Sequence, residues 1–220
     1  MVNVLIVGAS GMVGQGVLRE CLLDAGVERV VSLGRTKSGR SHPKMREIVH
    51  ADLTALSRPS GPLAGLDACF YCVGASAAGS SEAEYTRVNY SMTLAVAETL
   101  VRVKPDMTFV YVSGKGTDST ERGRVMWARV KGRTENALLR LPFKAAYMLR
   151  PGLIIPMHGI KSKTSWYRAI YTVMTPLYPV LHWLFPTSIT TTEHLGRVML
   201  RLGRSGYSKQ VLESADIAAL

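Results

Sequence analysis

The sequence predicts an α/β fold in which a doubly wound parallel sheet is covered by helices on both faces. Apolar segments of strand length recur along the chain, segments with helical spacing separate most of them, and a glycine-rich turn directly follows the first. Strands that are apolar throughout are typical of a parallel sheet, because crossover helices bury both of its faces. Together these features predict a Rossmann fold.

The apolar segments give the expected order of elements. Strands are expected at 2–7, 27–33, 45–50, 67–73, 108–112 and 145–149. Apolar residues recur at helical spacing over 12–25 and 83–103, so both segments are expected to be helices. Thr191 or Thr192 is expected to cap a last helix, because a threonine hydroxyl accepts hydrogen bonds from the free amides at a helix start.

The length of the chain favours one domain. A chain of 220 residues with 47% apolar content can bury one sizeable core, so we expect a single NAD(P)-binding Rossmann domain over 1–220. Within it, the proline-rich segment 156–190 is expected to form a small helical C-terminal cap, with two short helices meeting near Pro176. Its apolar stretch, 170–185, is shorter than the about 20 residues of a membrane-spanning helix.

The role of this cap stays open at this point. Its apolar side chains could cover a small apolar substrate, or they could lie on a membrane surface with the neighbouring basic residues near lipid headgroups. Plain core packing or a contact between copies of the chain, as in a homo-oligomer, fits the same pattern. His158 and His182 also lie in this region, and we expect both to be structural.

The net charge favours anionic partners. The formal charge is +11, and the whole basic excess lies in residues 101–220. A phosphorylated cofactor, an anionic membrane or a nucleic acid would fit such a field. No nucleic-acid-binding motif accompanies the charge, so we expect no nucleic-acid partner.

The cysteines indicate a reducing compartment. Cys21, Cys69 and Cys72 form an odd set without a disulfide framework, and no secretory signal is visible, so we expect a cytoplasmic protein. Cys69 and Cys72 have CxxC spacing, but residues three apart on a strand point to opposite faces. We therefore interpret them as packing residues rather than as a redox or metal pair.

A glycine-rich turn joins the first expected strand to the first expected helix. It consists of Gly8, Ala9, Ser10, Gly11, Met12, Val13 and Gly14. Gly8 permits the tight turn, Gly11 lets a pyrophosphate approach the backbone, and Gly14 lets the helix pack closely on the strand. The helix start adds free N–H groups and a positive dipole. The turn therefore predicts a dinucleotide site, bound by its residues other than Ala9.

The residue after the second strand favours NADP over NAD. An NAD site usually has a carboxylate about 20 residues beyond the turn, where it binds the ribose hydroxyls. Arg35 stands at this place, with Lys37 and Arg40 nearby. A guanidinium can bind a 2′-phosphate through two N–H groups and offers no acceptor to a hydroxyl.

Further motifs follow in an order typical of one superfamily. They are the turn 8–14, Arg35, Asp52-Leu53 after the third strand, Cys72-Val73-Gly74-Ala75-Ser76 after the fourth, and Val112-Ser113 after the fifth. This order resembles the atypical short-chain dehydrogenase/reductase superfamily, especially its NAD-dependent epimerase/dehydratase-like and Tat-interacting-protein-like members, over nearly the whole chain. The resemblance implies cofactor contacts from Asp52, Leu53, Val73, Gly74, Ala75, Pro151, Gly152 and Leu153.

The same resemblance implies a catalytic set in which one member is replaced. In that superfamily a serine after the fifth strand acts with a Tyr-x-x-x-Lys pair, whose tyrosine exchanges a proton with the substrate oxygen and whose lysine also holds the ribose. Ser113 and Lys131 match, but Trp127 stands in the place of the tyrosine. An indole N–H donates a hydrogen bond but does not titrate in water, so Trp127 cannot be a general acid or base.

Three interpretations of this replacement remain. Another group, such as Tyr111, Tyr85, Lys115 or a water, could supply the proton, or hydride transfer could need no such acid. Alternatively, the protein binds NADP without turnover, as a sensor or an assembly factor. The leading expectation is an NADP-dependent oxidoreductase acting on an apolar carbonyl-type substrate.

Overall fold

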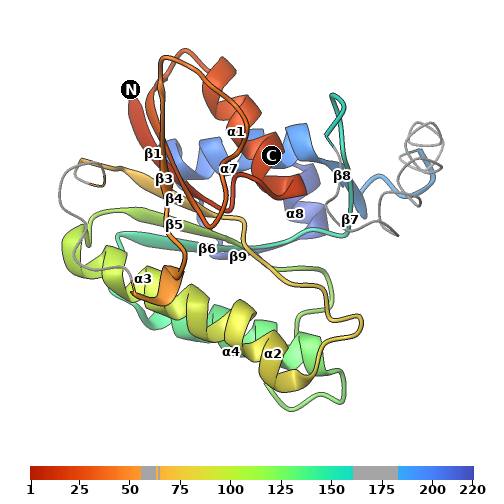
Figure 1. The fold of residues 1–220 in the computed structure, drawn as a ribbon. Coiled ribbons are helices and arrows are strands. Elements are labelled where there is room, and N and C mark those ends of the chain that lie inside the picture. The colour runs from red at the N-terminus through yellow and green to blue at the C-terminus, as the bar shows by residue number, and fades with distance from the viewer. Residues whose placement is uncertain (56–62, 64, 161–182) are drawn as a thin grey trace.

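The computed structural model describes residues 1–55, 63, 65–160 and 183–220. Their centre is a seven-stranded sheet in which every neighbouring pair of strands is parallel (Figure 1). In spatial order the strands are β3 (Met45–Val49), β2 (Val27–Gly34), β1 (Val2–Val7), β4 (Ala68–Tyr71), β5 (Thr108–Val112), β6 (Ala145–Arg150) and β9 (Val211–Glu213). This arrangement confirms the predicted doubly wound Rossmann fold.

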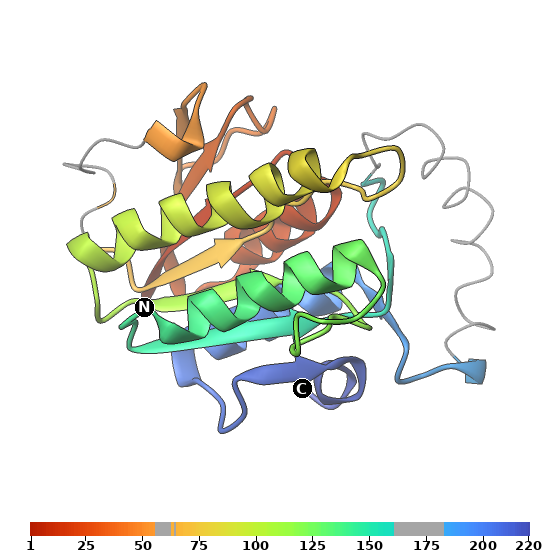
Figure 2. The same ribbon diagram turned by 90° about the horizontal axis from the view of Figure 1, so that it is seen from below.

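Helices cover both faces of the sheet (Figure 1). On one face lie α1 (Met12–Leu23), α7 (Thr192–Ser205) and the short α8 (Ser214–Ala218), and on the other α2 (Glu82–Thr86), α3 (Met92–Val103) and α4 (Met126–Arg140). Figure 2 shows α3 and α4 side by side across their face. Alternate residues of β1 divide between the two cores: Val4 and Ile6 join one cluster, and Leu5 and Val7 join the other.

The predicted helix over 83–103 is interrupted by one turn of a different kind. Between α2 and α3 the chain forms a π-helical turn, η2 (Arg87–Ser91). Such single turns are often found at functional sites. Here the turn carries the fully buried Asn89.

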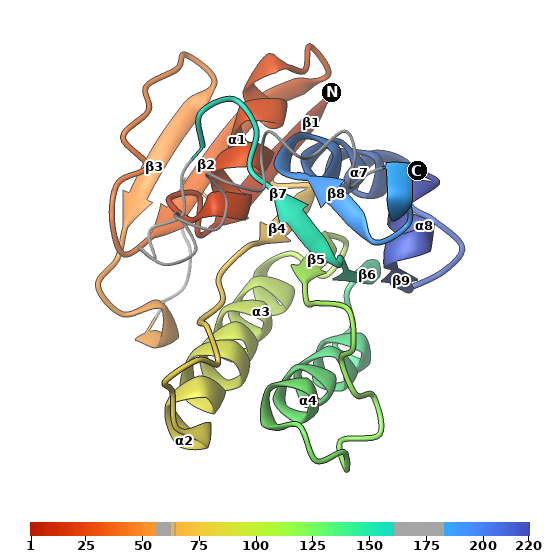
Figure 3. The same cartoon turned by 90° about the vertical axis from the view of Figure 1, so that its right-hand side faces the viewer.

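Two strands outside the main sheet were not expected. β7 (Leu153–Ile155) and β8 (Ile189–Thr191) pair in parallel beside the carboxyl ends of the main strands (Figure 3). β8 leads directly into α7, and the Thr191 side chain accepts a hydrogen bond from the amide of His194. The expected cap is therefore Thr191.

Most of the expected C-terminal cap lies outside the described residues. The segment 161–182, which includes Pro176 and His182, is among the residues left undescribed, so the two helices predicted there stay a prediction. Trp183, Leu184 and Phe185, which follow it, are exposed. Among the helices that are described, none combines the length and apolarity required to cross a membrane.

The two cysteines with CxxC spacing pack against opposite faces of the sheet as predicted, although only Cys69 lies within β4 and Cys72 directly follows it. Cys69 lies in the core beneath α3, whereas Cys72 packs against the core beneath α1 and α7. Both thiols are free, and burial raises the pKa of Cys72 to about 12. These are the properties of packing residues.

Candidate functional site

The glycine turn places the start of α1 at the carboxyl end of β1. Gly8 has a φ of +89°, a left-handed conformation that favours glycine, and its carbonyl accepts a hydrogen bond from Gly11 N at 3.0 Å. A Cβ added to Gly14 would lie 2.2 Å from the Gly8 oxygen, so any side chain there would push α1 away from the strand. The sequence predicted both roles.

A cleft of about 430 Å³ opens at this turn. Its lining residues are Gly8, Ser10, Gly11, Gly34, Arg35, Thr36, Leu53, Cys72, Val73 and Gly74. The structure therefore brings together the glycine turn, Arg35 and the segment after β4, as the sequence analysis expected. Arg35 is exposed, and none of the described residues in this lining carries a carboxylate.

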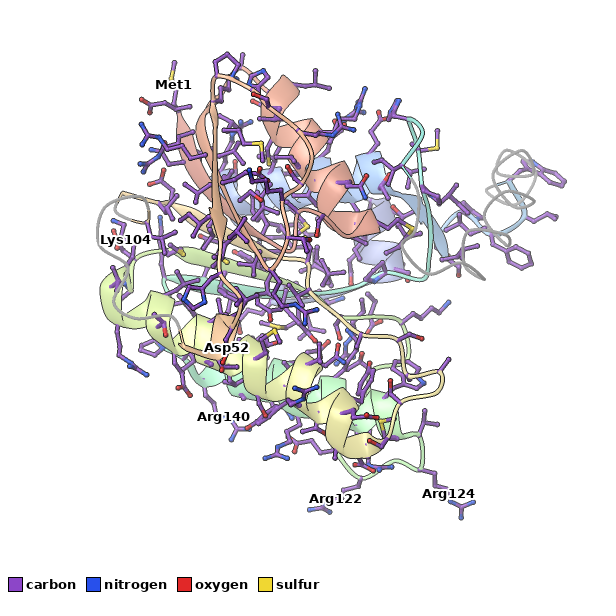
Figure 4. All side chains as sticks on the ribbon, in the orientation of Figure 1. Met1, Asp52, Lys104, Arg122, Arg124 and Arg140 are labelled. Atoms are coloured by element: carbon purple, nitrogen blue, oxygen red, sulfur yellow. The ribbon has the colours of Figure 1, made fainter. Side chains whose placement is uncertain are left out.

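Several of the expected cofactor residues lie beside this cleft rather than in its lining. Met12, Val13 and Gly14 belong to the first turn of α1, and Val13 packs against the core. Asp52 is exposed (Figure 4), and its carboxylate accepts hydrogen bonds from the amide and the hydroxyl of Thr54, at 2.9 and 2.7 Å, which lower its pKa. An adenine contact from Asp52 stays a prediction.

Asn89 holds the segment that borders the cleft, and the sequence analysis did not identify it. Its side-chain oxygen accepts a hydrogen bond from Ala75 N at 3.3 Å, and its amide donates to the Tyr85 carbonyl at 3.1 Å. Asn89 therefore ties the segment after β4 to the π-helical turn. The available signal was an amide side chain within an apolar helical segment, because a buried amide needs hydrogen-bonding partners.

Ser113 follows β5, and its hydroxyl lies 2.9 Å from that of Thr117. Thr117 Oγ1 donates its single proton to the Gly114 carbonyl at 2.8 Å, because a carbonyl oxygen can only accept. Ser113 must therefore be the donor in the Ser113–Thr117 bond. In this arrangement its oxygen keeps acceptor capacity, and donation to a substrate would require the Thr117 bond to break.

Lys131 extends from α4 to the carboxyl end of β5. Its Nζ lies 3.3 Å from Ser113 O, 3.4 Å from Val112 O and 3.5 Å from the Tyr111 hydroxyl. Burial lowers the pKa of Lys131 to about 8, while Glu135, one helical turn away, raises it. Lys131 is therefore mostly charged at pH 7, close to Ser113 as the resemblance implied.

Trp127 lies one turn before Lys131 on α4. A Cβ added to Gly116 would stand 3.5 Å from the end of the indole, so the ring packs on the loop after β5. The other side chains named as possible proton donors are already engaged. Tyr111 and Tyr85 are buried, and Lys115 Nζ donates a hydrogen bond to Ser188 Oγ at 2.9 Å. Burial also raises the pKa of Tyr111, which weakens it as an acid.

The segment after β6 is held against the loops around it. Pro151 O accepts from Lys115 N at 2.8 Å, and Leu153 N donates to Ser188 O at 3.0 Å. A Cβ on Gly152 would lie 2.2 Å from the same Ser188 oxygen, so this position needs glycine for close approach. These contacts show that Pro151, Gly152 and Leu153 fix the loops, while their contact with a nicotinamide stays a prediction.

Arg150, just before this segment, makes a buried ion network that the sequence analysis also missed. Its Nε lies 3.1 Å from both carboxylate oxygens of Glu135, whose side chain is 1% exposed. Its Nη1 donates to Glu213 Oε1 at 2.9 Å, and its Nη2 donates to Ser119 Oγ at 2.5 Å. Arg150 thus joins α4, β9 and the loop after β5, and its side chain turns into the protein.

Part of the basic excess is exposed on the surface around α4. Arg122 and Arg124, on the loop before α4, and Arg140, at its end, point into solvent (Figure 4). They are consistent with the expected attraction of anionic partners, which stays a prediction.

The fold and the glycine turn define this protein as a Rossmann-type α/β protein with a dinucleotide-binding turn. Residues 4–120, more than half of the chain, match the model of the NAD dependent epimerase/dehydratase family. The chain belongs to this family. The resemblance inferred from the motifs is thereby confirmed.

The curated relatives contradict the expected cytoplasmic location. The chain is 28% identical over 161 residues to the protein fmp52, mitochondrial, of Emericella nidulans, and the match covers 70% of this chain and 67% of that protein. Relatives from other fungi are likewise named mitochondrial. The expected cytoplasmic location is therefore wrong: an odd set of free cysteines indicates reduced thiols but does not distinguish between reducing compartments.

Solved structures share the fold of this protein. The enzyme WbmF of Bordetella bronchiseptica, solved in complex with NAD+, is 17% identical and has a TM-score of 0.66, over 99% of this chain and 76% of that one. An oxidoreductase of the short-chain dehydrogenase/reductase family from Burkholderia thailandensis is 18% identical, with a TM-score of 0.64 over 100% and 93%. At these identities the likeness is one of fold.

Proposed function

We propose that the chain binds a nicotinamide dinucleotide at the carboxyl ends of β1, β2 and β4, and that it prefers NADP to NAD. The observation that carries the proposal is the cleft that Gly8, Gly11 and Arg35 line together. The start of α1 offers backbone N–H groups and the positive end of the helix dipole to a pyrophosphate. A lining without carboxylates offers a ribose 2′-hydroxyl no charged acceptor, whereas Arg35 suits a 2′-phosphate.

The residues present fit such a cofactor. Gly11 has no atom closer than 3.4 Å to an added Cβ, so glycine is not required there by packing within the described protein. Its lack of a side chain is instead explained by a ligand that approaches the backbone. Gly14 differs, because its close contact with Gly8 O already requires glycine.

We further propose an oxidoreductase that acts on an apolar carbonyl-type substrate. A bound nicotinamide would supply or accept the hydride. Lys131 would hold the ribose hydroxyls and, as a cation, would stabilise negative charge on the substrate oxygen. Ser113 would contact the same oxygen after its bond to Thr117 rearranges. The Trp127 ring would form part of the wall of the substrate site and would not donate a proton to the substrate. The proton would then come from a water molecule.

A second candidate is binding without turnover, as a sensor or an assembly factor. The observation that favours it is the indole of Trp127 against Gly116, where the superfamily has its acid. Among the described groups within 3.5 Å of Lys131 Nζ, the Tyr111 hydroxyl is the one that could titrate as an acid, and burial raises its pKa. Both candidates use the same cofactor cleft.

Fluorescence titration with NADPH and NADH tests the cofactor proposal. We expect tighter binding of NADPH, and we expect Arg35→Asp to weaken NADPH binding about 100-fold while leaving NADH within a few fold, since a charge-assisted pair is replaced by repulsion. Arg122→Asp is the matched control, because it makes the same charge change on an exposed loop. Equal affinity for both nucleotides in the unaltered protein would exclude the NADP preference, and absence of binding would exclude the cofactor.

Trp127→Tyr distinguishes the two candidate functions. The variant is assayed with NADPH against a panel of small apolar aldehydes and ketones, beside the unaltered protein and Trp127→Phe. A gain of reductase activity with tyrosine, but not with phenylalanine, would support an oxidoreductase pocket. Cofactor binding without any such gain would favour the binding protein.

A further inference from the structure

The candidate catalytic site holds a cation in a fixed place. Lys131 Nζ lies within 3.5 Å of the carbonyl oxygens of Val112 and Ser113 and of the Tyr111 hydroxyl. It also stands 5.2 Å from the centre of the Tyr111 ring, whose π-electrons attract a cation. These contacts hold the ammonium group at the carboxyl end of β5. A substrate oxygen that becomes negative beside it is stabilised.

The carboxyl groups around this cation are held as carboxylates. Glu135, one turn further along α4, accepts hydrogen bonds from Arg150 Nε through both oxygens at 3.1 Å. Asp118, on the loop after β5, accepts from Thr120 Oγ1 at 2.6 Å and from Gly123 N at 2.7 Å, and such bonds lower its pKa. A carboxylate only accepts hydrogen bonds, so neither group has a proton to give to a substrate.

The hydroxyl groups near the cation do not supply a proton either. The Tyr111 side chain is fully buried, and burial raises its pKa. Ser113 donates to Thr117 Oγ1, whose own proton goes to the Gly114 carbonyl. The indole of Trp127 does not titrate in water. Within the described part of the chain, the site therefore offers a cation to a negative oxygen and no accessible acid.

Such a site favours a substrate whose reduced form is a weakly basic anion. Hydride addition to an aldehyde or a simple ketone leaves an alkoxide, which is about as basic as hydroxide, since water has a pKa of about 16. Reduction of a quinone leaves a phenolate instead, and a phenol has a pKa of about 10. The alkoxide needs an acid as it forms, whereas the phenolate can take its proton from water afterwards.

Trp127 suits the same class of substrate by its shape. Its side chain is only partly buried, and it lies one helical turn before Lys131 on α4. Aromatic rings pair by offset stacking or by edge-to-face contact, so a large indole beside a cation favours a flat aromatic ligand. A quinone is flat, and its ring is aromatic once it is reduced.

We propose that the candidate catalytic site reduces quinones to hydroquinones. The inference rests on the proposed function, because the dihydronicotinamide cofactor of that proposal is the reductant. The quinone accepts a hydride, with both electrons of the C4–H bond of the cofactor, and one of its oxygens becomes a hydroxyl. The ring becomes aromatic, and the other oxygen is left as a phenolate. Lys131 stabilises that phenolate until water supplies the one proton that completes the hydroquinone.

Binding of a chromogenic phenol tests the site without turnover. The protein is titrated with 4-nitrophenol one pH unit below the pKa of the free phenol, where the yellow colour reports the phenolate. We expect the pKa of the bound phenol to fall by about one unit, because a neighbouring cation favours the charged form, and we expect Lys131→Met to lose this shift. Lys144→Met is the matched control, because it removes the same charge just before β6, at the amino end of that strand.

The titration needs no nucleotide, so its outcome is separate from that of the cofactor proposal. The absence of a colour change with the unaltered protein would overturn the inference. A colour change that persists in Lys131→Met would overturn it as well, because the phenolate would then bind elsewhere.

Turnover with saturating NADPH tests the activity itself on three substrates of similar size: 1,4-naphthoquinone, 2-naphthaldehyde and 1-tetralone. After subtraction of the rate without protein, we expect the quinone to be reduced at least about 100-fold faster than the other two, since general acid catalysis typically contributes at least that factor. The quinone rate should be the same in heavy water, because no proton moves together with the hydride. Lys131→Met should lose most of the rate, and Lys144→Met should keep it.

The outcomes separate this inference from the proposed function. Reduction of the aldehyde as fast as the quinone would overturn the inference and leave the oxidoreductase proposal in place. NADPH binding without reduction of the quinone would overturn it and favour the binding protein. A rate that falls severalfold in heavy water would also overturn it, because a proton donor would then act in the hydride step.

Discussion

The buried ion network of Arg150 makes a quantitative prediction about stability. Arg150→Met would leave the Glu135 carboxylate, with 1% of its side chain exposed, without its cation. Removing one partner of a buried pair typically costs 3–5 kcal/mol, because an uncompensated charge stays in a medium of low dielectric, so we expect a loss of about 4 kcal/mol. Urea unfolding at 25 °C measures this loss directly, and a thermal melt should show a fall of about 12 °C for a chain of this size.

Two further variants separate burial from charge. Arg204→Met removes a comparable pair with Asp24, but these side chains are 34% and 29% exposed, so we expect a loss of about 1 kcal/mol. In the double variant Glu135→Leu with Arg150→Met no buried charge is left between α4 and β6, and most of the lost stability should return. A loss below about 1 kcal/mol in Arg150→Met, or no recovery in the double variant, would refute the reasoning.

Three other predictions follow from contacts and pKa values described above. Gly132→Ala should lower the free energy of unfolding in urea by about 3 kcal/mol, because the new Cβ would lie 1.7 Å from the Asp118 carbonyl oxygen. Alanine has the higher helix propensity, so without this contact the variant would be at least as stable as the unaltered protein. Unchanged stability would therefore contradict the contact. NADPH affinity should fall as the pH rises through about 8, where Lys131 loses its proton and its charge, and titrations of Lys131→Met should lack this dependence. Cys69 is fully buried, which raises its pKa, so it should not react with a thiol reagent at pH 8 until urea unfolds the protein, and rapid labelling of Cys69 in the native protein would contradict its packing role.

The fold was predictable because its signals are local and repeated. The expected strands at 2–7 and 108–112 match β1 and β5 residue for residue, and those at 27–33 and 145–149 each end one residue early. Apolar strands flanked by helical periodicity leave few alternatives to a parallel sheet. β7, β8 and β9 were missed because each has only three residues, too few to show a period.

The site was predictable to the extent that each residue adjoins a strand end. Gly8, Arg35 and Gly74 follow different strands, and a parallel sheet brings such ends to one edge. The partners of Arg150 and Asn89 were not predictable in the same way. Glu135 is 15 positions before Arg150, and Ala75 is 14 positions before Asn89, so the contacts depend on how α4 and the π-helical turn pack.

Trp127 shows most clearly what a sequence can and cannot reveal about chemistry. The spacing to Lys131 was enough to show that an indole replaces a titrating phenol. It could not show that Tyr111, at the end of β5, places its hydroxyl 3.5 Å from Lys131 yet is fully buried. Nor could it show that the proton of Ser113 is directed to Thr117. The described residues near Lys131 thus lack an accessible acid, so a reaction at this site depends on a proton from water, and binding alone does not.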